Sequence, residues 1–133
     1  MKVVVIDGQG GKIGKLLIEQ IKRSYPAISI VAIGTNSIAT AGMMKAGADY
    51  GATGENPIIV NVRDADAIIG PMGIIIADSL LGEITPAIAT AVCQSKAQKI
   101  LIPLNKCSTT IVGMVECSLA EAIQMVIIQL AKL

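Results

Sequence analysis

Residues 3–15 read V-V-V-I-D-G-Q-G-G-K-I-G-K, and this stretch decides the fold that the sequence predicts. Four β-branched apolar residues indicate a short buried strand, the glycine cluster indicates a tight turn, and residues 12–23 follow with helical spacing. At the start of such a helix several backbone N–H groups lack partners, and the helix dipole favours negative charge there. The stretch therefore predicts a phosphate-binding turn, although it indicates no particular reaction.

The spacing of the glycines departs from the common dinucleotide pattern G-x-G-x-x-G, because Ile13 stands where the third glycine should be. Gly8, Gly11 and Gly14 instead fit a looser G-x-x-G-x-x-G turn. In that turn the first glycine bends the chain, the second lets a diphosphate approach, and the third packs the helix on the strand. A P-loop does not fit, since Leu16 replaces its magnesium-binding Ser or Thr. A glycine-rich turn without any ligand stays open as the alternative.

Three further predicted strands, at 28–33, 67–70 and 99–103, are each followed by a glycine- or asparagine-containing segment. Parallel strands of an open α/β sheet end at one edge, where ligands bind. We therefore expect the segments after these strands to face the first glycine turn. The predicted cofactor-binding residues are Asp7, Gly8, Gln9, Gly10, Gly11, Lys12, Ile13, Gly14, Thr35, Asn36, Ser37, Gly70, Pro71, Met72 and Asn105.

The end of the second predicted strand lacks the Asp or Glu that binds ribose hydroxyls in NAD-binding domains. Thr35, Asn36 and Ser37 stand there instead, so NAD is less favoured, and NADP, a mononucleotide or another phosphorylated ligand is left open. A simpler interpretation is that Asn36 or Ser37 caps the next helix, at 38–46, which then ends at Gly47. Capping and ligand binding are compatible. NAD or NADP remains the cofactor that we expect if the ligand is a dinucleotide.

The remaining segments predict further short elements. Residues 48–57 indicate a loop or a very short strand, and Glu55 is either a site residue or part of a helix start. We expect Asp78, Ser79 and Glu83 to lie on a solvated face after strand 67–70. The predicted helices occupy 58–62, 74–81, 86–94 with Thr85 as cap, and 119 to the C-terminus behind a Ser118/Glu121 capping box; residues 109–114 are predicted as an edge strand.

The alternation of strands and helices predicts an α/β fold. A strand, a helix and a second strand within the first 34 residues form a βαβ unit. With 133 residues we expect a single domain over 1–133, with a Rossmann-like three-layer fold and a mostly parallel sheet.

The composition favours a homo-oligomer. Apolar residues make up 53% of the chain and the mean hydropathy is +0.67, so more apolar surface is present than one small core can hide. The last helix is apolar over most of its circumference, with Met125, Ile128 and Leu133 outside its main stripe. We therefore expect copies of the chain to associate through the C-terminal helix.

Several partners are not expected. Eleven basic and ten acidic residues without a charged block, two tyrosines and no Phe or Trp argue against nucleic acid. The longest apolar run, 67–77, is broken by Gly70, Pro71 and Gly73, so no membrane span is expected. The N-terminal apolar run stops at Asp7, which is too short for a signal peptide, and we expect a cytoplasmic protein.

The residues available for catalysis are few. No histidine is present, which excludes Ser-His-Asp and Cys-His mechanisms. Three cysteines without C-x-x-C spacing predict reduced thiols and no structural metal. Cys107, next to Lys106, is either an activated nucleophile or an inert thiol. Whether the protein is an enzyme is left open.

Five segments together resemble a known family: I-D-G-Q-G-G-K-I-G at 6–14, G-T-N at 34–36, K-A-G-A-D-Y-G-A-T-G-E-N at 45–56, I-G-P-M-G at 69–73 and L-I-P-L-N-K-C at 101–107. The chain is similar over nearly its whole length to an uncharacterised bacterial family, domain of unknown function 3842. The resemblance implies a compact cytoplasmic bacterial protein with a Rossmann-like fold. It implies no activity and no catalytic residues.

Two functions follow as hypotheses. The first is a nucleotide- or NAD(P)-binding protein, either with an unknown reaction or as a minimal enzyme whose substrate pocket a second subunit completes. The second is a non-catalytic nucleotide-sensing or scaffold module that acts as a homo-oligomer. The short chain and the absence of histidine favour the second in part.

Overall fold

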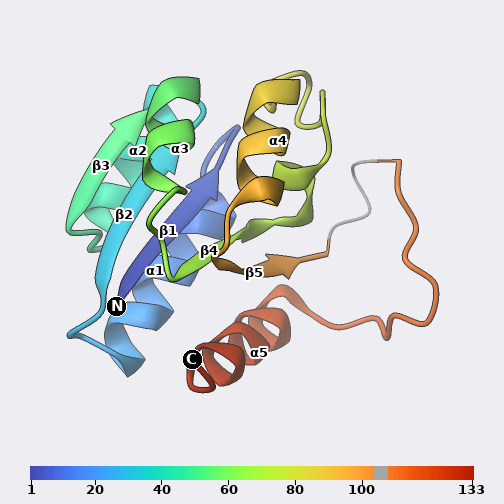
Figure 1. Ribbon diagram of the computed structural model, residues 1–133. Helices are drawn as coiled ribbons and strands as arrows, with labels where there is room; N and C mark the ends of the chain where they lie inside the picture. The colour runs from blue at the N-terminus through green and yellow to red at the C-terminus, as the bar shows by residue number, and fades with distance from the viewer. Residues whose placement is uncertain (104–107) are drawn as a thin grey trace.

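The computed structural model of the protein describes residues 1–103 and 108–133 and contains a five-stranded parallel sheet (Figure 1). The strand order is β3-β2-β1-β4-β5, and every pair of neighbours is parallel. The expected α/β fold is confirmed, and the sheet is parallel throughout the described residues. The strands are β1 (Lys2–Asp7), β2 (Ser29–Gly34), β3 (Tyr50–Thr53), β4 (Ala67–Pro71) and β5 (Gln98–Ile102).

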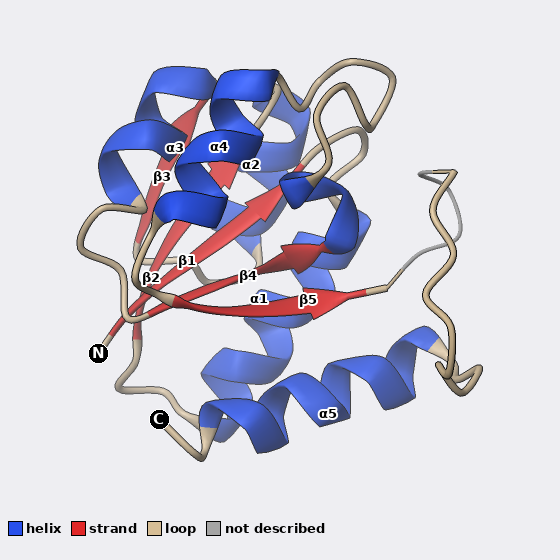
Figure 2. Ribbon diagram, turned by 45° about the vertical axis from the view of Figure 1, so that its right-hand side comes forward, coloured by secondary structure: helices blue, strands red, loops and turns tan. Residues whose placement is uncertain are grey.

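Helices cover both faces of the sheet (Figure 2). α1, α2 and α5 pack on one face, and α3, α4 and the short 3-10 helix η1 pack on the other, which makes three layers. No helix among the described residues is long and apolar enough to cross a membrane. The helices are α1 (Lys12–Ser24), α2 (Ser37–Lys45), α3 (Glu55–Asn61), η1 (Met72–Ile75), α4 (Pro86–Gln94) and α5 (Leu119–Leu130).

β1 is central because its apolar residues are buried on both faces. Side chains alternate along a strand, so Val3 and Val5 pack against α1 and α5 while Val4 and Ile6 face α3 and α4. All four are completely buried. Burial of each such side chain contributes about 1.5–3 kcal/mol, which is why an uninterrupted apolar run forms a strand here.

The predicted caps are confirmed at three helices. Asn36 accepts a hydrogen bond from the backbone of Ala39 at the start of α2, and Thr85 accepts one from Ile88 at the start of α4. At α5, Ser118 and Glu121 form the expected capping box. α2 ends before Gly47, which has a φ of 116°, a backbone conformation that glycine adopts readily and other residues rarely. These ends are set by local hydrogen bonds, and so they follow from short sequence patterns.

The predicted helix over 74–81 is wrong. Only η1 is helical there, and the following residues form a turn in which Asp78, Leu80 and Leu81 have positive φ. Ser79 is buried and donates its hydroxyl to the carbonyl of Gly73, at 2.5 Å, which folds the segment back on itself. The predicted solvated face for these residues is therefore also wrong for Ser79. An apolar run this short does not distinguish a helix from a packed turn.

Two other boundaries differ from the prediction. Residues 109–114 form no strand, because the sheet of the described residues ends at β5 and this exposed segment runs outside it, with a positive φ at Gly113. α3 begins at Glu55 rather than at 58, with Gly54 before it and Pro57 in its first turn. Proline is tolerated in a first helical turn, where its missing N–H has no partner to lose. Residues 48–57 thus contain both β3 and the start of α3.

Gly70 provides a test of how tightly β1 and β4 approach. A Cβ on Gly70 would lie 2.3 Å from the carbonyl oxygen of Ile6, so Gly70→Ala must push the two central strands apart. We expect the variant to lose about 1–3 kcal/mol of unfolding free energy in chemical denaturation. The control is Gly42→Ala in α2, where a Cβ meets nothing within 4 Å and should stabilise the helix by about 0.5–1 kcal/mol. Equal stability of Gly70→Ala and the native protein would contradict this packing.

Candidate functional site

The site is built on the carboxylate of Asp7, at the end of β1. Its Oδ1 accepts a hydrogen bond from Gly8 N at 2.8 Å and its Oδ2 accepts one from Gly14 N at 2.7 Å. Gly14 is the third residue of α1, so Asp7 does from the strand what an N-cap side chain does from the helix. The local N-cap residue, Gly11, has no side chain to offer. The first strand and the first helix are therefore joined by one carboxylate.

Two backbone donors of the turn are left without a protein acceptor. Within the described part of the chain, neither Gly10 N nor Lys12 N donates a hydrogen bond, whereas Gly11 N donates to the carbonyl of Gly8 at 2.9 Å. Lys12 is the first residue of α1, where the helix dipole is positive. Asp7 accepts hydrogen bonds from Gly8 N and Gly14 N, and the turn therefore leaves Gly10 N and Lys12 N available to an anion.

The glycines of the turn have different roles. Gly11 has a φ of 74°, and a Cβ there would lie 2.8 Å from the Cα of Ala39 in α2. Gly14 is equally confined, since its Cβ would lie 2.5 Å from the sulfur of Met43. A Cβ on Gly10 meets nothing within 4 Å. Helix packing thus requires the second and third glycines of the G-x-x-G-x-x-G pattern, and Gly10 is the one that leaves open space.

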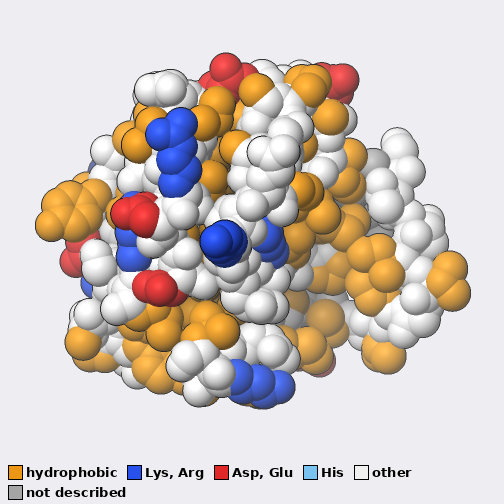
Figure 3. Space-filling view, in the orientation of Figure 1, with side chains coloured by type: hydrophobic (Ala, Val, Ile, Leu, Met, Phe, Trp, Pro, Cys, Tyr) orange, Lys and Arg blue, Asp and Glu red, His pale blue; other side chains and the backbone are white. Residues whose placement is uncertain are grey.

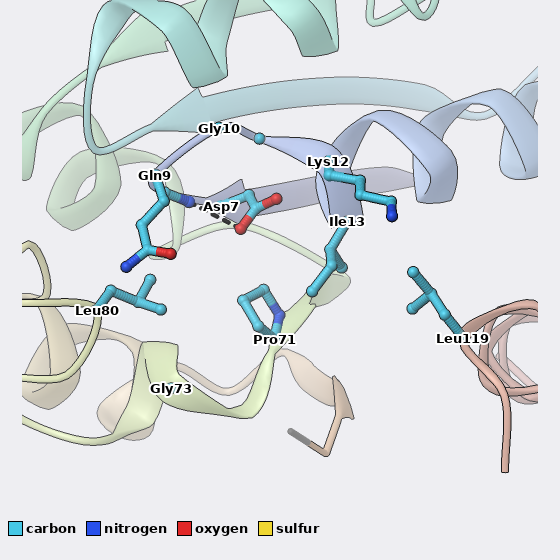
Figure 4. A pocket seen from close by; sticks show the side chains of 11 residues that line it. Asp7, Gln9, Gly10, Lys12, Ile13, Pro71, Gly73, Leu80 and Leu119 are labelled. Atoms are coloured by element: carbon cyan, nitrogen blue, oxygen red, sulfur yellow. Dashed lines mark hydrogen bonds between the residues drawn. The ribbon is translucent and has the colours of Figure 1, made fainter. Parts of the chain in front are cut away.

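A cavity of about 280 Å³ lies against the turn at the boundary between β1 and β4 (Figure 4). This is where the strand order reverses, and ligands of open α/β sheets bind at such a point. Pro71 lies across from Asp7, with Leu80 toward one side and Leu119 of α5 toward the other. The cavity is lined by Asp7, Gly8, Gln9, Gly10, Gly11, Lys12, Ile13, Pro71, Gly73, Leu80 and Leu119.

The structure gathers only part of the predicted site at this cavity. The turn from Asp7 to Ile13 and Pro71 line it, whereas Gly14 lies behind the turn against α2. Three predicted residues have structural positions instead: Gly70 and Met72 are buried, and Ser37 begins α2. Asn105 and Cys107 lie outside the described residues. The lining residues that the prediction did not include in its site are Gly73, Leu80 and Leu119.

Glu83 is the residue of this region that the sequence prediction placed wrongly. Its Oε1 accepts from Gln9 N at 2.9 Å, and its Oε2 accepts from Thr35 Oγ1 at 2.7 Å and from Asn36 Nδ2 at 2.8 Å. Glu83 therefore joins the glycine turn to the end of β2 and is not part of a solvated helix face. The sequence offered one indication of this role, the missing acid after the second strand, because another carboxylate could take that position.

The two carboxylates have opposite pKa shifts. Burial raises the pKa of Asp7 above its ordinary value of 3.8, against the lowering effect of the Gly14 and Gly8 N–H groups, and the charge of Glu83 raises it further. Burial also acts to raise the pKa of Glu83, but its hydrogen bonds from Asn36, Thr35 and Gln9 outweigh this and hold the pKa below 4.5. Glu83 is thus the more firmly ionised of the two.

Glu55 lies apart from the cavity. Its carboxylate accepts a hydrogen bond from the hydroxyl of Thr85, which caps α4, so it joins the starts of α3 and α4. Glu55 does not line the cavity at the turn. In residues 1–103 and 108–133, no three Asp, Glu, His or Cys side chains group closely enough to hold a metal ion.

Comparisons with known proteins identify the family and the fold. The family described as Domain of unknown function (DUF3842) matches residues 2–133, so the chain belongs to it, as the sequence motifs indicated. No curated protein matches the chain. Among solved structures, the chain is similar to a dodecameric FMN-dependent UbiX-like decarboxylase from Escherichia coli O157:H7, with a TM-score of 0.52 and 16% identity. The match covers 98% of this chain and 76% of that one, and at this identity it shows a shared fold.

The hydrogen bonds of Glu83 predict a pH-dependent contribution to stability. Because the folded-state pKa of Glu83 is lowered, its contribution is present above pH 4.5 and is lost as the pH falls through that lowered value. We expect Glu83→Gln to have a lower melting temperature than the native protein near pH 7. The difference should shrink when thermal unfolding is repeated below pH 4.5.

The matched control is Glu19→Gln, which removes a carboxylate from the middle of α1, away from the glycine turn. A melting-temperature difference for Glu83→Gln that is constant across this pH range would contradict the assigned hydrogen bonds.

Proposed function

We propose that this member of the family binds a nucleotide or another phosphorylated small molecule, with a phosphate group at the Gly8–Gly14 turn. One observation carries the proposal: Gly10 N and Lys12 N have no acceptor among the described residues, and they lie at the start of α1 on the wall of a cavity. Unpaired N–H groups at a helix N-terminus form an anion site, because both the hydrogen bonds and the dipole favour negative charge.

The negative charge of Asp7 is compatible with a bound phosphate. Asp7 is only 5% exposed, and its two oxygens accept hydrogen bonds from Gly8 N and Gly14 N. These two N–H dipoles partly offset the negative charge of the carboxylate. Lys12 is exposed at the cavity wall, and its ammonium group can reach a phosphate as a counter-charge.

The opposite wall suits an apolar or planar group. Pro71, Leu80 and Leu119 form most of the side-chain surface there, so a ring system attached to the phosphate would pack between them. Flavin mononucleotide has both parts, and the structurally similar decarboxylase is described as FMN-dependent. FMN is therefore our first candidate, and NAD and NADP are the dinucleotide candidates.

A non-catalytic role is the second candidate. Among the described residues, the titratable side chains that line the cavity are Asp7 and Lys12, and Asp7 accepts hydrogen bonds from two backbone N–H groups. Neither described thiol, Cys93 or Cys117, lines it. This arrangement favours a module that binds a nucleotide and reports on it without converting it.

Ligand binding is tested by thermal unfolding with FMN, AMP, ATP, GTP, NAD, NADP and coenzyme A, each at millimolar concentration. At a concentration 100 times its Kd, a ligand of the folded state adds about 2.7 kcal/mol of stability, and the melting temperature rises. We expect at least one compound to do so. No shift with any of them would contradict the proposal.

Gly10→Val identifies the binding site. A Cβ on Gly10 meets no protein atom within 4 Å, so the variant should fold. The added side chain lies at the cavity wall, and we expect it to lower the apparent affinity for the ligand at least tenfold and so to reduce the ligand-induced rise in melting temperature. Gly42→Val is the matched control, because Gly42 also has no neighbour within 4 Å but lies in α2 away from the cavity. Binding retained by Gly10→Val would place the ligand elsewhere.

We further propose that copies of the chain associate through α5. Its inner side packs on α1 and β5, whereas Met125 and Ile128 on its outer side are 54% and 58% exposed. The preceding segment adds Val112 and Val115, which are 94% and 85% exposed. Hydrophobic side chains are visible on the right of Figure 3, where the chain before α5 runs in Figure 1. Apolar groups gathered in this way are typical of a protein interface.

Association through α5 is tested by light scattering at micromolar concentration. The native protein should scatter as an oligomer, and the double variant Met125→Glu/Ile128→Glu should scatter as a monomer, since two charges would be buried at the interface. Thr90→Glu/Gln94→Glu is the matched control, because it adds two charges at exposed polar positions of α4, on the other face of the sheet. A monomeric native protein would contradict the association.

A further inference from the structure

The glycine turn has two sides, and the structure treats them differently. Toward β4 lies the cavity described above. Toward β2 lies the space where Rossmann-type dinucleotide sites hold the ribose of the second nucleoside, bound by an acid at the end of the second strand. In this chain β2 ends at Gly34 and is followed by Thr35 and Asn36, without an acid. The groups that occupy this second space therefore affect which phosphorylated ligands can bind.

The carboxylate of Glu83 fills the β2 side of the turn. It reaches across from the loop between η1 and α4 and uses Gln9 N, Thr35 Oγ1 and Asn36 Nδ2 as donors. The Asn36 amide also donates to the carbonyl of Gln9, at 2.9 Å. The polar groups that a ribose or a second phosphate would need on this side are thus already paired within the protein.

The space between Gly8 and Thr35, beside the Glu83 carboxylate, is also tightly packed. A single added Cβ on Gly8 would lie 2.6 Å from Thr35 Oγ1 and 3.4 Å from Glu83 Oε1. A sugar ring on this side would have to displace the Glu83 carboxylate from its bonds with Gln9 N, Thr35 Oγ1 and Asn36 Nδ2. The ionised carboxylate next to Gln9 N would in addition repel a second phosphate, as like charges do at short range.

The loop that carries Glu83 also shapes the open side of the turn. Leu80 and Leu81 both have left-handed backbone conformations, with φ of 54° and 56°, which bulky residues rarely adopt. This conformation brings Leu80 to the cavity wall, while Glu83, three residues later, reaches the β2 side. One strained loop therefore lines the side that stays open and closes the side that is filled.

We propose that Glu83 is a specificity-determining residue that restricts the site to ligands with a single nucleoside or ring group on the phosphate. Mononucleotides and other phosphate monoesters fit the β4 side alone. Dinucleotides such as NAD or FAD need the β2 side for their adenosine half and are excluded by the Glu83 carboxylate. The inference rests on the proposed function, because it assumes that the phosphate binds at the Gly8–Gly14 turn.

The test compares each dinucleotide with its own half. Isothermal titration calorimetry with FMN and FAD, and with nicotinamide mononucleotide and NAD, gives two affinity ratios for the native protein. We expect at least one mononucleotide to bind, at least tenfold more tightly than the matching dinucleotide. In Glu83→Ala we expect that ratio to fall toward one through tighter dinucleotide binding. Glu55→Ala is the matched control, since Glu55 is a hydrogen-bonded acid at the start of α3 and does not line the cavity at the turn.

The outcomes separate this inference from the proposed function. A dinucleotide that binds the native protein as well as its half does, or binds when the half does not, overturns the role of Glu83 and leaves phosphate binding intact. If none of these compounds and no member of the thermal panel binds, both proposals fail. If Glu83→Ala unfolds, Glu83→Ser replaces it. With either variant, the affinity ratio of the native protein must favour the mononucleotide for the inference to stand. An unchanged ratio in a folded Glu83 variant also overturns the inference.

Discussion

The arrangement of this site depends on the buried carboxylate of Asp7, which joins the end of β1 to the start of α1. Two hydrogen bonds to a charged group, of about 1.5–3 kcal/mol each, offset the cost of burying it. Because Asp7 satisfies Gly8 N and Gly14 N from beneath, the turn keeps its shape without a ligand. Among the described residues, the donors that it leaves without an acceptor in this turn are Gly10 N and Lys12 N, and the proposed phosphate would bind to them.

A second carboxylate completes the turn from the other side. Glu83 supplies, from a loop far along the chain, the acid that a Rossmann-like domain usually carries at the end of its second strand. Its bonds go to the protein, so it acts there as a structural brace. Asp7 and Glu83 also interact, since the charge of Glu83 raises the pKa of Asp7. Two carboxylates, one on each side of the turn, therefore set the negative charge around it.

Local sequence patterns predicted most of the fold. The order of strands and helices, the caps at Asn36, Thr85 and Ser118, and the end of α2 before Gly47 all depend on residues within one turn of each other. The errors fell at 74–81 and at 109–114, where apolar runs alone favour regular structure. In the first, contacts of Ser79 and Glu83 with distant segments override that preference. In the second, no neighbouring strand is available for pairing.

The sequence by itself determined the glycine turn, the βαβ unit around it and the location of the crevice, because strand ends and helix starts are encoded in short stretches. Only the tertiary structure decided which glycine is open, which strand ends line the cavity, and what occupies the β2 side. Gly11 is confined by the backbone of Ala39 and Gly14 by the side chain of Met43, both in α2, and Glu83 reaches Gln9 across 74 positions. Contacts over such separations depend on how the layers pack, and no local pattern records them.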